Sequence, residues 1–158
     1  MLNGGESLMA IRTRRWNEPV RPDDGLRILV TRFRPRGVRK ERETWTRWSR
    51  ELGPSEALHA DAYGKNGPPI SFEEYSARYL SEMAAHRAQI SDLAVRVRQG
   101  ENITLLCSTA CTDPRRCHRT LLKTLIEAEL PEELRSPPEP APAELVNPAF
   151  SKLKSWLE

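Results

Sequence analysis

The sequence predicts a compact α/β domain with a small, mainly parallel sheet, helices that flank it and a proline-rich C-terminal arm. Two apolar runs have the character of buried strands, Leu26–Thr31 and Ile103–Cys107. Segments with helical spacing lie between these runs and after the second one. An order of strand, helices, strand and helix is typical of parallel strands joined by crossover connections. The length of 158 residues suits one domain.

The chain is expected to begin with a strand over residues 9–15, where Ile11 alternates with arginines. A turn region follows over residues 17–25, which contain two prolines and a glycine. After the first buried strand, proline and glycine in the segment Arg32–Val38 indicate a loop that leaves the end of that strand.

Two helical regions are predicted between the buried strands. The first covers residues 41–52, with an apolar stripe made of Trp45, Trp48 and Leu52. The second begins at Ser71, whose hydroxyl and Glu74 suit a capping box, and it is expected to break near Ser91 and to end at Gly100. Its apolar positions recur at helical spacing and are Phe72, Tyr75, Tyr79, Met83, Ile90, Leu93, Ala94 and Val97.

The last predicted helix covers residues 114–129, with Asp113 as its N-cap and Pro114 at its first position. The alternative is a start near Cys117, which would place that thiol in the first turn and let His118 and Arg119 point into the loop site. Its core-facing residues are Leu121, Leu122, Leu125 and Ile126. The domain is therefore expected to span residues 9–130. Residues 131–158 contain 6 prolines and are expected to form an extended arm with a short terminal helix.

The net charge of +3 conceals a basic N-terminal third. Residues 11–50 carry 13 Arg or Lys against 5 Asp or Glu, a local balance of +8. This region is either a solvated basic surface or contributes arginines to an anion site, because arginine favours bidentate contact with carboxylate or phosphate. No run approaches the ~20 apolar residues of a membrane span, and the start lacks the features of a secretory signal. The odd number of cysteines, 3, then favours reduced thiols in a cytoplasm.

The segment 105–119 concentrates the residues that carry chemistry. It holds all three cysteines, His118 and three arginines. A strand that ends in a thiol and leads to a helix start offers a nucleophile, free backbone N–H groups and the positive end of a helix dipole. This combination suits an anionic ligand. The simpler interpretation is that Cys107 and Cys117 are small buried core residues.

The two loops together resemble the domain-of-unknown-function 488 family of small bacterial and archaeal proteins. The matching residues are Arg32, Pro35, Arg36, Gly37, Cys107, Asp113, Pro114, Cys117, His118 and Arg119. The resemblance covers residues 9–130 and implies a compact α/β domain with a site built from these loops. Two features depart from the family's pattern: Thr31 stands where an acidic residue is common, and Cys111 is an extra thiol in a longer loop.

We expect a small anionic ligand, nucleotide-like or phosphorylated, to bind between the Arg32–Gly37 loop and the Cys107–Arg119 loop. Both loops follow parallel strands, and ligands of such sheets bind at the carboxyl ends of the strands. The expected ligand-binding residues are Arg32, Arg34, Arg36, Cys117 and Arg119. If the ligand reacts, Cys107 is the expected nucleophile and His118 the proton carrier. The residues identify no particular cofactor.

The three thiols also suit a metal site or a redox switch. Cys107, Cys111, Cys117 and His118 supply enough donors for zinc, although their spacing matches no familiar zinc finger. Cys111 could instead pair with either other thiol in a redox switch.

Nucleic-acid binding is the main alternative, because Arg14, Arg15 and Trp16 belong to the basic third. A phosphatase signature is absent, because the sixth residue after Cys107 is Asp113 and the sixth after Cys111 is Cys117, where that signature needs an arginine.

Overall fold

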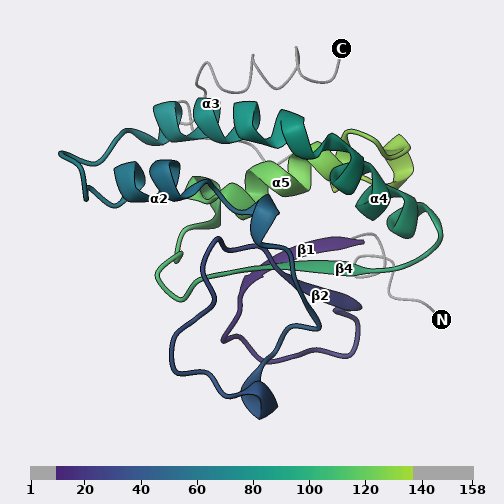
Figure 1. The fold of residues 1–158 in the computed structure, drawn as a ribbon. Coiled ribbons are helices and arrows are strands. Elements are labelled where there is room, and N and C mark those ends of the chain that lie inside the picture. Colours follow the sequence, from purple (N-terminus) through teal and green to yellow (C-terminus); the bar gives the residue numbers. More distant parts are fainter. Residues whose placement is uncertain (1–9, 137–158) are drawn as a thin grey trace.

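A computed structural model describes residues 10–136 and contains one sheet of four parallel strands (Figure 1). The strands are β1 (Ile11–Arg15), β2 (Leu26–Leu29), β3 (Arg47–Trp48) and β4 (Ile103–Cys107). Their order in the sheet is β1-β4-β2-β3, so β4 lies between the two strands nearest the N-terminus. The predicted α/β class and the parallel sheet are confirmed.

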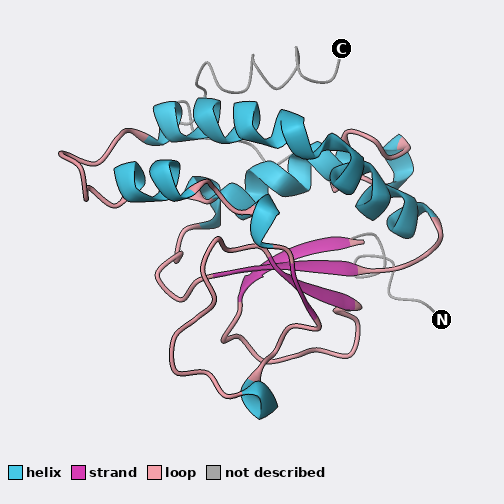
Figure 2. Ribbon diagram, in the orientation of Figure 1, coloured by secondary structure: helices cyan, strands magenta, loops and turns pink. Residues whose placement is uncertain are grey.

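The α-helices all lie on one face of the sheet (Figure 2). They are α2 (Glu56–Ala62), α3 (Phe72–Met83), α4 (Arg87–Arg98) and α5 (His118–Glu127). Alternate residues of the strands, such as Ile28 and Leu105, point into this helical layer and form the main core with its buried apolar residues. The predicted helix faces are confirmed by the burial of Tyr79, Leu93 and Leu125.

The other face of the sheet is covered by chain without α-helix (Figure 2). Leu29 and Leu106 point to this side and form a second, smaller cluster with the buried side chain of Trp45. The connection from β2 to β3 carries one 3-10 turn, Lys40–Arg42. The sheet therefore has an apolar core on both faces, which explains why adjacent residues such as Ile28 and Leu29 of β2 are both apolar.

The predicted helix over residues 41–52 is wrong. Instead of a helix, this segment contains the 3-10 turn, the short strand β3 and a second 3-10 turn, Arg50–Leu52. The backbone N–H groups of Thr46 and Ser49 donate to carbonyls of β2, so the segment pairs with the sheet. Trp45 and Leu52 belong to apolar clusters on opposite faces of the sheet, which one helical stripe could not supply.

The predicted break near Ser91 is also misplaced, because the helices α3 and α4 are separated by a 3-10 turn at Ala84–His86. The capping prediction at Ser71 is confirmed in part, since its hydroxyl accepts from the Glu74 backbone N–H at 3.1 Å. Gly100 has φ 96° just after α4, as expected for the residue that ends a helix.

The last helix begins at the alternative position near Cys117 and not at Pro114, and this difference matters for the site. Asp113 caps only a short 3-10 turn, Pro114–Arg116, and α5 begins at His118. Cys117 between them has extended backbone, with φ −136° and ψ 142°, and is the N-cap of α5. The thiol of Cys117 is thereby placed beside the end of β4.

A buried ion pair ties the chain before β2 to the sheet. The Arg27 guanidinium lies 2.5 Å from an Asp24 carboxylate oxygen, and Arg14 of β1 approaches the other oxygen at 3.3 Å. The Thr104 hydroxyl of β4 donates to the Asp24 carbonyl at 2.8 Å. These contacts link the central strand to both of its neighbours through one carboxylate-bearing residue.

Part of the predicted C-terminal arm lies within the described residues. Residues 132–134 form a 3-10 turn, and the Arg135 guanidinium donates to the Leu130 carbonyl at 2.9 Å. The rest of the arm, including its predicted terminal helix, and the first residue of the predicted strand at 9–15 lie outside the described residues. Within the described range, no helix is long and apolar enough to cross a membrane.

Candidate functional site

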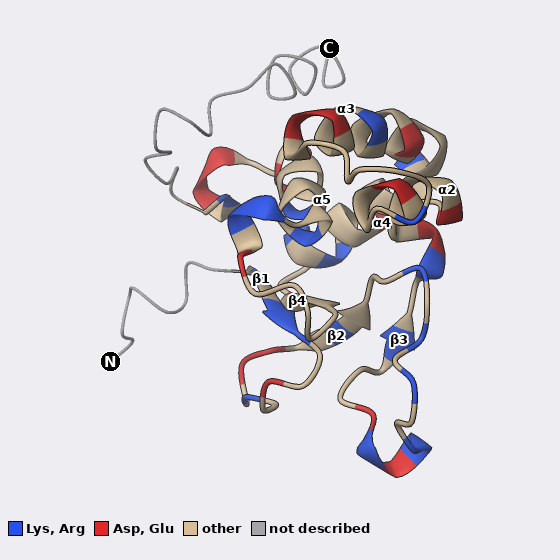
Figure 3. Ribbon diagram, turned by 90° about the vertical axis from the view of Figure 1, so that its left-hand side faces the viewer, with Lys and Arg blue, Asp and Glu red and all other residues tan. Residues whose placement is uncertain are grey.

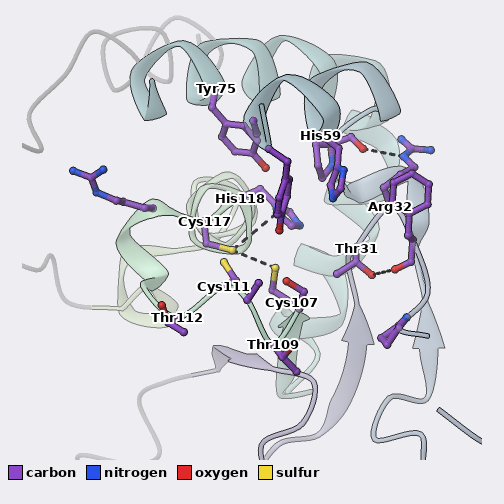
Figure 4. Close-up of a pocket in the computed structure, with 18 of the residues that line it drawn as sticks. Thr31, Arg32, His59, Tyr75, Cys107, Thr109, Cys111, Thr112, Cys117 and His118 are labelled. Atoms are coloured by element: carbon purple, nitrogen blue, oxygen red, sulfur yellow. Dashed lines mark hydrogen bonds between the residues drawn. The ribbon is translucent and has the colours of Figure 1, made fainter. Parts of the chain in front are cut away.

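A cavity of roughly 930 Å³ opens at the carboxyl ends of β2 and β4 (Figure 4). Its walls come from the Arg32–Arg36 segment, the Cys107–Asp113 segment, and residues of α2 and α3. Because β2 and β4 are parallel neighbours, both loops leave the sheet at the same edge. The structure therefore brings the two loops singled out in the sequence to one cavity.

Three thiols meet on the wall of this cavity. The Sγ atoms of Cys107, Cys111 and Cys117 all lie within 4.8 Å of one another, and those of Cys107 and Cys117 are 3.4 Å apart. Each sulfur is positioned by a different local feature: the last residue of β4, a turn in which the Cys111 N–H donates to the Ser108 carbonyl, and the N-cap of α5. Cys107 and Cys117 are buried, whereas Cys111 is half-buried.

The three thiols differ in how readily they ionise. Hydrogen bonding with Cys111, together with burial, raises the pKa of Cys107 to about 12, even though Cys117 and the Ser108 N–H act in the opposite direction. Burial and the other two sulfurs also raise the pKa of Cys117. The pKa of Cys111 is lowered, because the other two thiols donate to its sulfur and Arg119 lies nearby. The cationic Arg119 thus favours a thiolate at Cys111, whereas the thiol form is favoured at Cys107.

His118 is buried at the start of α5 and lines the cavity. Its Nε2 lies 2.7 Å from the Val30 carbonyl oxygen and must donate to it, since a carbonyl can only accept. In the neutral ring Nδ1 is therefore unprotonated, and it faces the Cys117 Sγ at 4.0 Å. Burial lowers the pKa of His118, which favours this neutral form. The Cys117 thiol is therefore placed to transfer a proton to Nδ1 of this ring.

Arg119 lies behind the thiols instead of lining the cavity. Its side chain is only 4% exposed, and Nη2 donates to the Cys111 carbonyl at 3.3 Å. Its Nε and Nη1 atoms are buried and have no hydrogen-bond partner among residues 10–136. A buried guanidinium with free donors is costly, so this group is placed to compensate negative charge in its surroundings.

The arginines of the loop after β2 all line the cavity, but they are held differently. Arg32 donates from Nε to the Pro54 carbonyl at 2.9 Å. Arg34 forms an ion pair with Glu43 at 2.5 Å and lies over the Trp45 ring. Arg36 is exposed and forms no ion pair within the described part of the chain. Figure 3 shows basic residues along the connection that carries this loop towards β3.

Helix α2 and the segment that follows it supply site residues that the sequence did not predict. Lys65 contributes a further cation, and His59 of α2 and Tyr63 contribute stacked rings with centroids 4.5 Å apart. Phe33, from the loop after β2, meets His59 edge-on at 5.1 Å. The two glycines and two prolines at residues 64–69 could have indicated part of this site, because they predict a loop between helices and binding residues are common in such loops.

The arginines of β1 do not form a free basic stripe. Arg12 pairs with Asp23 at 2.8 Å, Arg14 with Asp24 at 3.3 Å, and Arg15 lies 3.9 Å from Glu18. Trp16 packs edge-on against Trp45 at 5.8 Å between ring centroids. The positive charge expected to favour nucleic acid is thus partly neutralised by the turn that follows β1.

Comparison with known proteins places the chain in a family. A family model described as the active DUF488-N3 subclade matches residues 11–130, and the chain belongs to that family. The Escherichia coli protein YeaO, described as uncharacterised, is 32% identical over 104 residues, which cover 66% of this chain and 87% of the relative.

Uncharacterised proteins of Mycobacterium bovis and Mycobacterium tuberculosis are 34% identical over 73 residues, or 46% of this chain and 59% of theirs. No solved structure matches the chain. The family assignment agrees with the resemblance identified from the two loops.

Proposed function

We propose that the cavity binds a small anionic ligand, nucleotide-like or phosphorylated, between the Arg32–Gly37 loop and the Cys107–Arg119 loop. The observation that carries this proposal is the charge of the lining. Five described lining residues are cationic and one is acidic, and they are Arg32, Arg34, Arg36, Lys65, Arg116 and Asp113. A concave site lined by charge of one sign attracts and orients a ligand of the opposite sign.

The cationic side chains are of two kinds: some are held by other residues, and others are free to contact a ligand. Arg32 and Arg34 are held by Pro54 and Glu43, and this gives the wall a defined shape. Arg36, Lys65 and Arg116 are exposed, and none of them has an ion-pair partner among residues 10–136. These three side chains can therefore turn towards a phosphate without first breaking a contact with a carboxylate.

Aromatic rings on the wall favour a ligand that also carries a planar group. Tyr63 is 57% exposed and Phe33 is 46% exposed, and both line the cavity with His59 between them. Exposed aromatic rings of this kind provide stacking surfaces for a base. Any thiol-based reaction with Cys107 as nucleophile and His118 as proton carrier would take place in the same cavity, because both residues line it.

Calorimetric titration with three probes tests this proposal: inorganic phosphate, a nucleoside monophosphate and the matching nucleoside. We expect the monophosphate to bind more tightly than either of its parts. Replacing Arg36, Lys65 or Arg116 with Gln should weaken its binding by about 10- to 150-fold, because a hydrogen bond to a charged group contributes about 1.5–3 kcal/mol.

Arg39→Gln is the matched control, because Arg39 is exposed on the same connection but does not line the cavity. The Arg39 variant should bind as the parent protein does. The proposal is wrong if neither phosphate-bearing probe binds, or if the Arg36 and Arg39 variants lose affinity equally.

A further inference from the structure

We propose that Cys107, Cys111 and Cys117 form a three-thiolate site for Zn²⁺, with the fourth coordination position open to the cavity. The proposal does not depend on the identity of the anionic ligand. The zinc proposal concerns the three sulfur atoms, whose proximity the anion-binding function does not explain. The three cysteines come from the end of β4, the following turn and the N-cap of α5, and they meet at one point (Figure 4).

The spacing of the sulfurs suits a single ion. Zinc binds thiolates at about 2.3 Å in tetrahedral geometry, which separates neighbouring sulfurs by about 3.8 Å. Here the Cys107 and Cys117 sulfurs are 3.4 Å apart, and every pair lies within 4.8 Å. Side-chain adjustments of a few tenths of an ångström to about 1 Å would therefore complete the geometry without moving the sheet or α5.

Core packing and disulfide formation explain the cluster less well. Burial as small apolar side chains would account for Cys107 and Cys117, but Cys111 is half-buried on a polar turn. A disulfide would use two sulfurs and leave the third beside it. A soft divalent cation uses all three, because thiolates are its preferred ligands and their mutual repulsion is offset by its charge.

The surroundings match the charge that such a site would carry. Three thiolates and one Zn²⁺ have a net charge of −1. The buried guanidinium of Arg119 lies beside Cys111, bound to its carbonyl, with Nε and Nη1 unpartnered among the described residues.

The open position is the feature that distinguishes this site from a structural zinc site. Structural sites have four protein ligands, whereas catalytic zinc keeps three and leaves one position for water or substrate. All three cysteines line the cavity, so the free position would face its cationic wall, which consists of Arg32, Arg34, Arg36, Lys65 and Arg116. An anionic ligand held by that wall would be placed next to the ion.

The test uses the full chain, reduced and freed of metal by a chelator under anaerobic conditions. Zinc is titrated against a chromophoric chelator, and Co²⁺ serves as a spectroscopic probe in a parallel titration. We expect one Zn²⁺ per chain, sulfur-to-cobalt charge-transfer bands, and zinc protection of all three thiols from alkylation, measured by mass spectrometry.

Cys111→Ser is the decisive variant, because the half-buried turn should accept serine without loss of folding. It should weaken zinc binding by more than the roughly 10–100-fold that follows loss of an outer hydrogen-bond partner. Cys107→Ala and Cys117→Ala should do the same, with thermal melting used to verify that each variant is folded. Arg119→Gln should weaken binding by about 10–100-fold.

Arg36→Gln separates this proposal from the proposed function. It should bind zinc as the parent does while losing affinity for the monophosphate, since Arg36 belongs to the cationic wall and not to the sulfur cluster. The zinc proposal is overturned if the reduced protein binds zinc no more tightly than its folded Cys111→Ser variant. It is also overturned if the anaerobically purified protein contains a Cys107–Cys117 disulfide.

Discussion

Gly53→Ala should destabilise the protein because residue 53 touches the backbone of the loop after β2. A Cβ atom at this position would lie 2.5 Å from the Arg32 nitrogen and 2.8 Å from the Thr31 carbonyl carbon. Both neighbours are backbone atoms, so no side chain can rotate away, and the segments would have to separate by about 1 Å to reach ordinary contact. Gly53 has φ −80°, so the effect is steric and owes nothing to backbone conformation.

The magnitude follows from the cost of overpacking. Forcing extra atoms into a packed site typically costs about 1–3 kcal/mol, and we expect a loss of about 2 kcal/mol in the free energy of unfolding. With a urea dependence of about 2 kcal/mol per molar, the unfolding midpoint should fall by about 1 M. Because Arg32 is anchored to Pro54, the residue after Gly53, the same variant should also weaken monophosphate binding in the cavity.

Gly37 provides the matched comparison. It has φ 73° and no atom within 4 Å of an added Cβ, so its replacement costs about 1 kcal/mol of backbone energy without a clash. Gly53→Ser should be less stable than Gly53→Ala, while Gly37→Ser and Gly37→Ala should be equally stable. A Gly53→Ala variant within about 0.5 kcal/mol of the parent would refute the steric argument.

Three further predictions concern buried polar groups. Asp24→Asn should lower the free energy of unfolding by about 3–5 kcal/mol in urea titration, because it leaves the Arg27 charge buried without its partner. Although burial opposes ionisation, backbone and guanidinium donors hold the pKa of Asp24 below its ordinary value. Its stabilisation should thus be complete above about pH 4 and fade as the pH falls through the native pKa, a dependence that the Asn variant should lack. Tyr79→Phe should cost about 1–2 kcal/mol in the same assay, because it leaves the buried Leu52 carbonyl without its donor at 2.7 Å. In an NMR pH titration the buried ring of His118 should remain neutral below the ordinary imidazole pKa of ~6.5, and protonation at that pH would contradict its burial.

The sequence alone was sufficient for the parts of the fold that local pattern governs. Runs rich in apolar residues predicted β2 and β4, and the 3.6-residue spacing predicted the buried faces of α3, α4 and α5. The order of these elements predicted the parallel sheet. Since parallel neighbours end at the same edge, the sequence also predicted that the loops after β2 and β4 would meet.

Only the tertiary structure determined the secondary structure of segments whose pairing partners are distant in sequence. Trp45, Trp48 and Leu52 have helical spacing, yet Trp45 and Leu52 pack on opposite faces of the sheet and Trp48 lies in β3. Pairing with β2 gives the segment around Trp48 backbone hydrogen bonds and lets its neighbours be buried on both faces of the sheet. These contributions outweigh a weak local preference for helix.

The thiol cluster is the clearest case of an arrangement that the sequence did not predict. The spacing of Cys107, Cys111 and Cys117 matches no familiar metal motif, and the sequence left their roles open. Their proximity arises because α5 begins at His118 and not at Pro114, which turns Cys117 out of the helix and towards the end of β4. Cys117 therefore has extended backbone instead of helical backbone, and this changes the direction of its side chain. The meeting of three sulfurs therefore depends on how the helix docks against the sheet, which spacing along the chain does not encode.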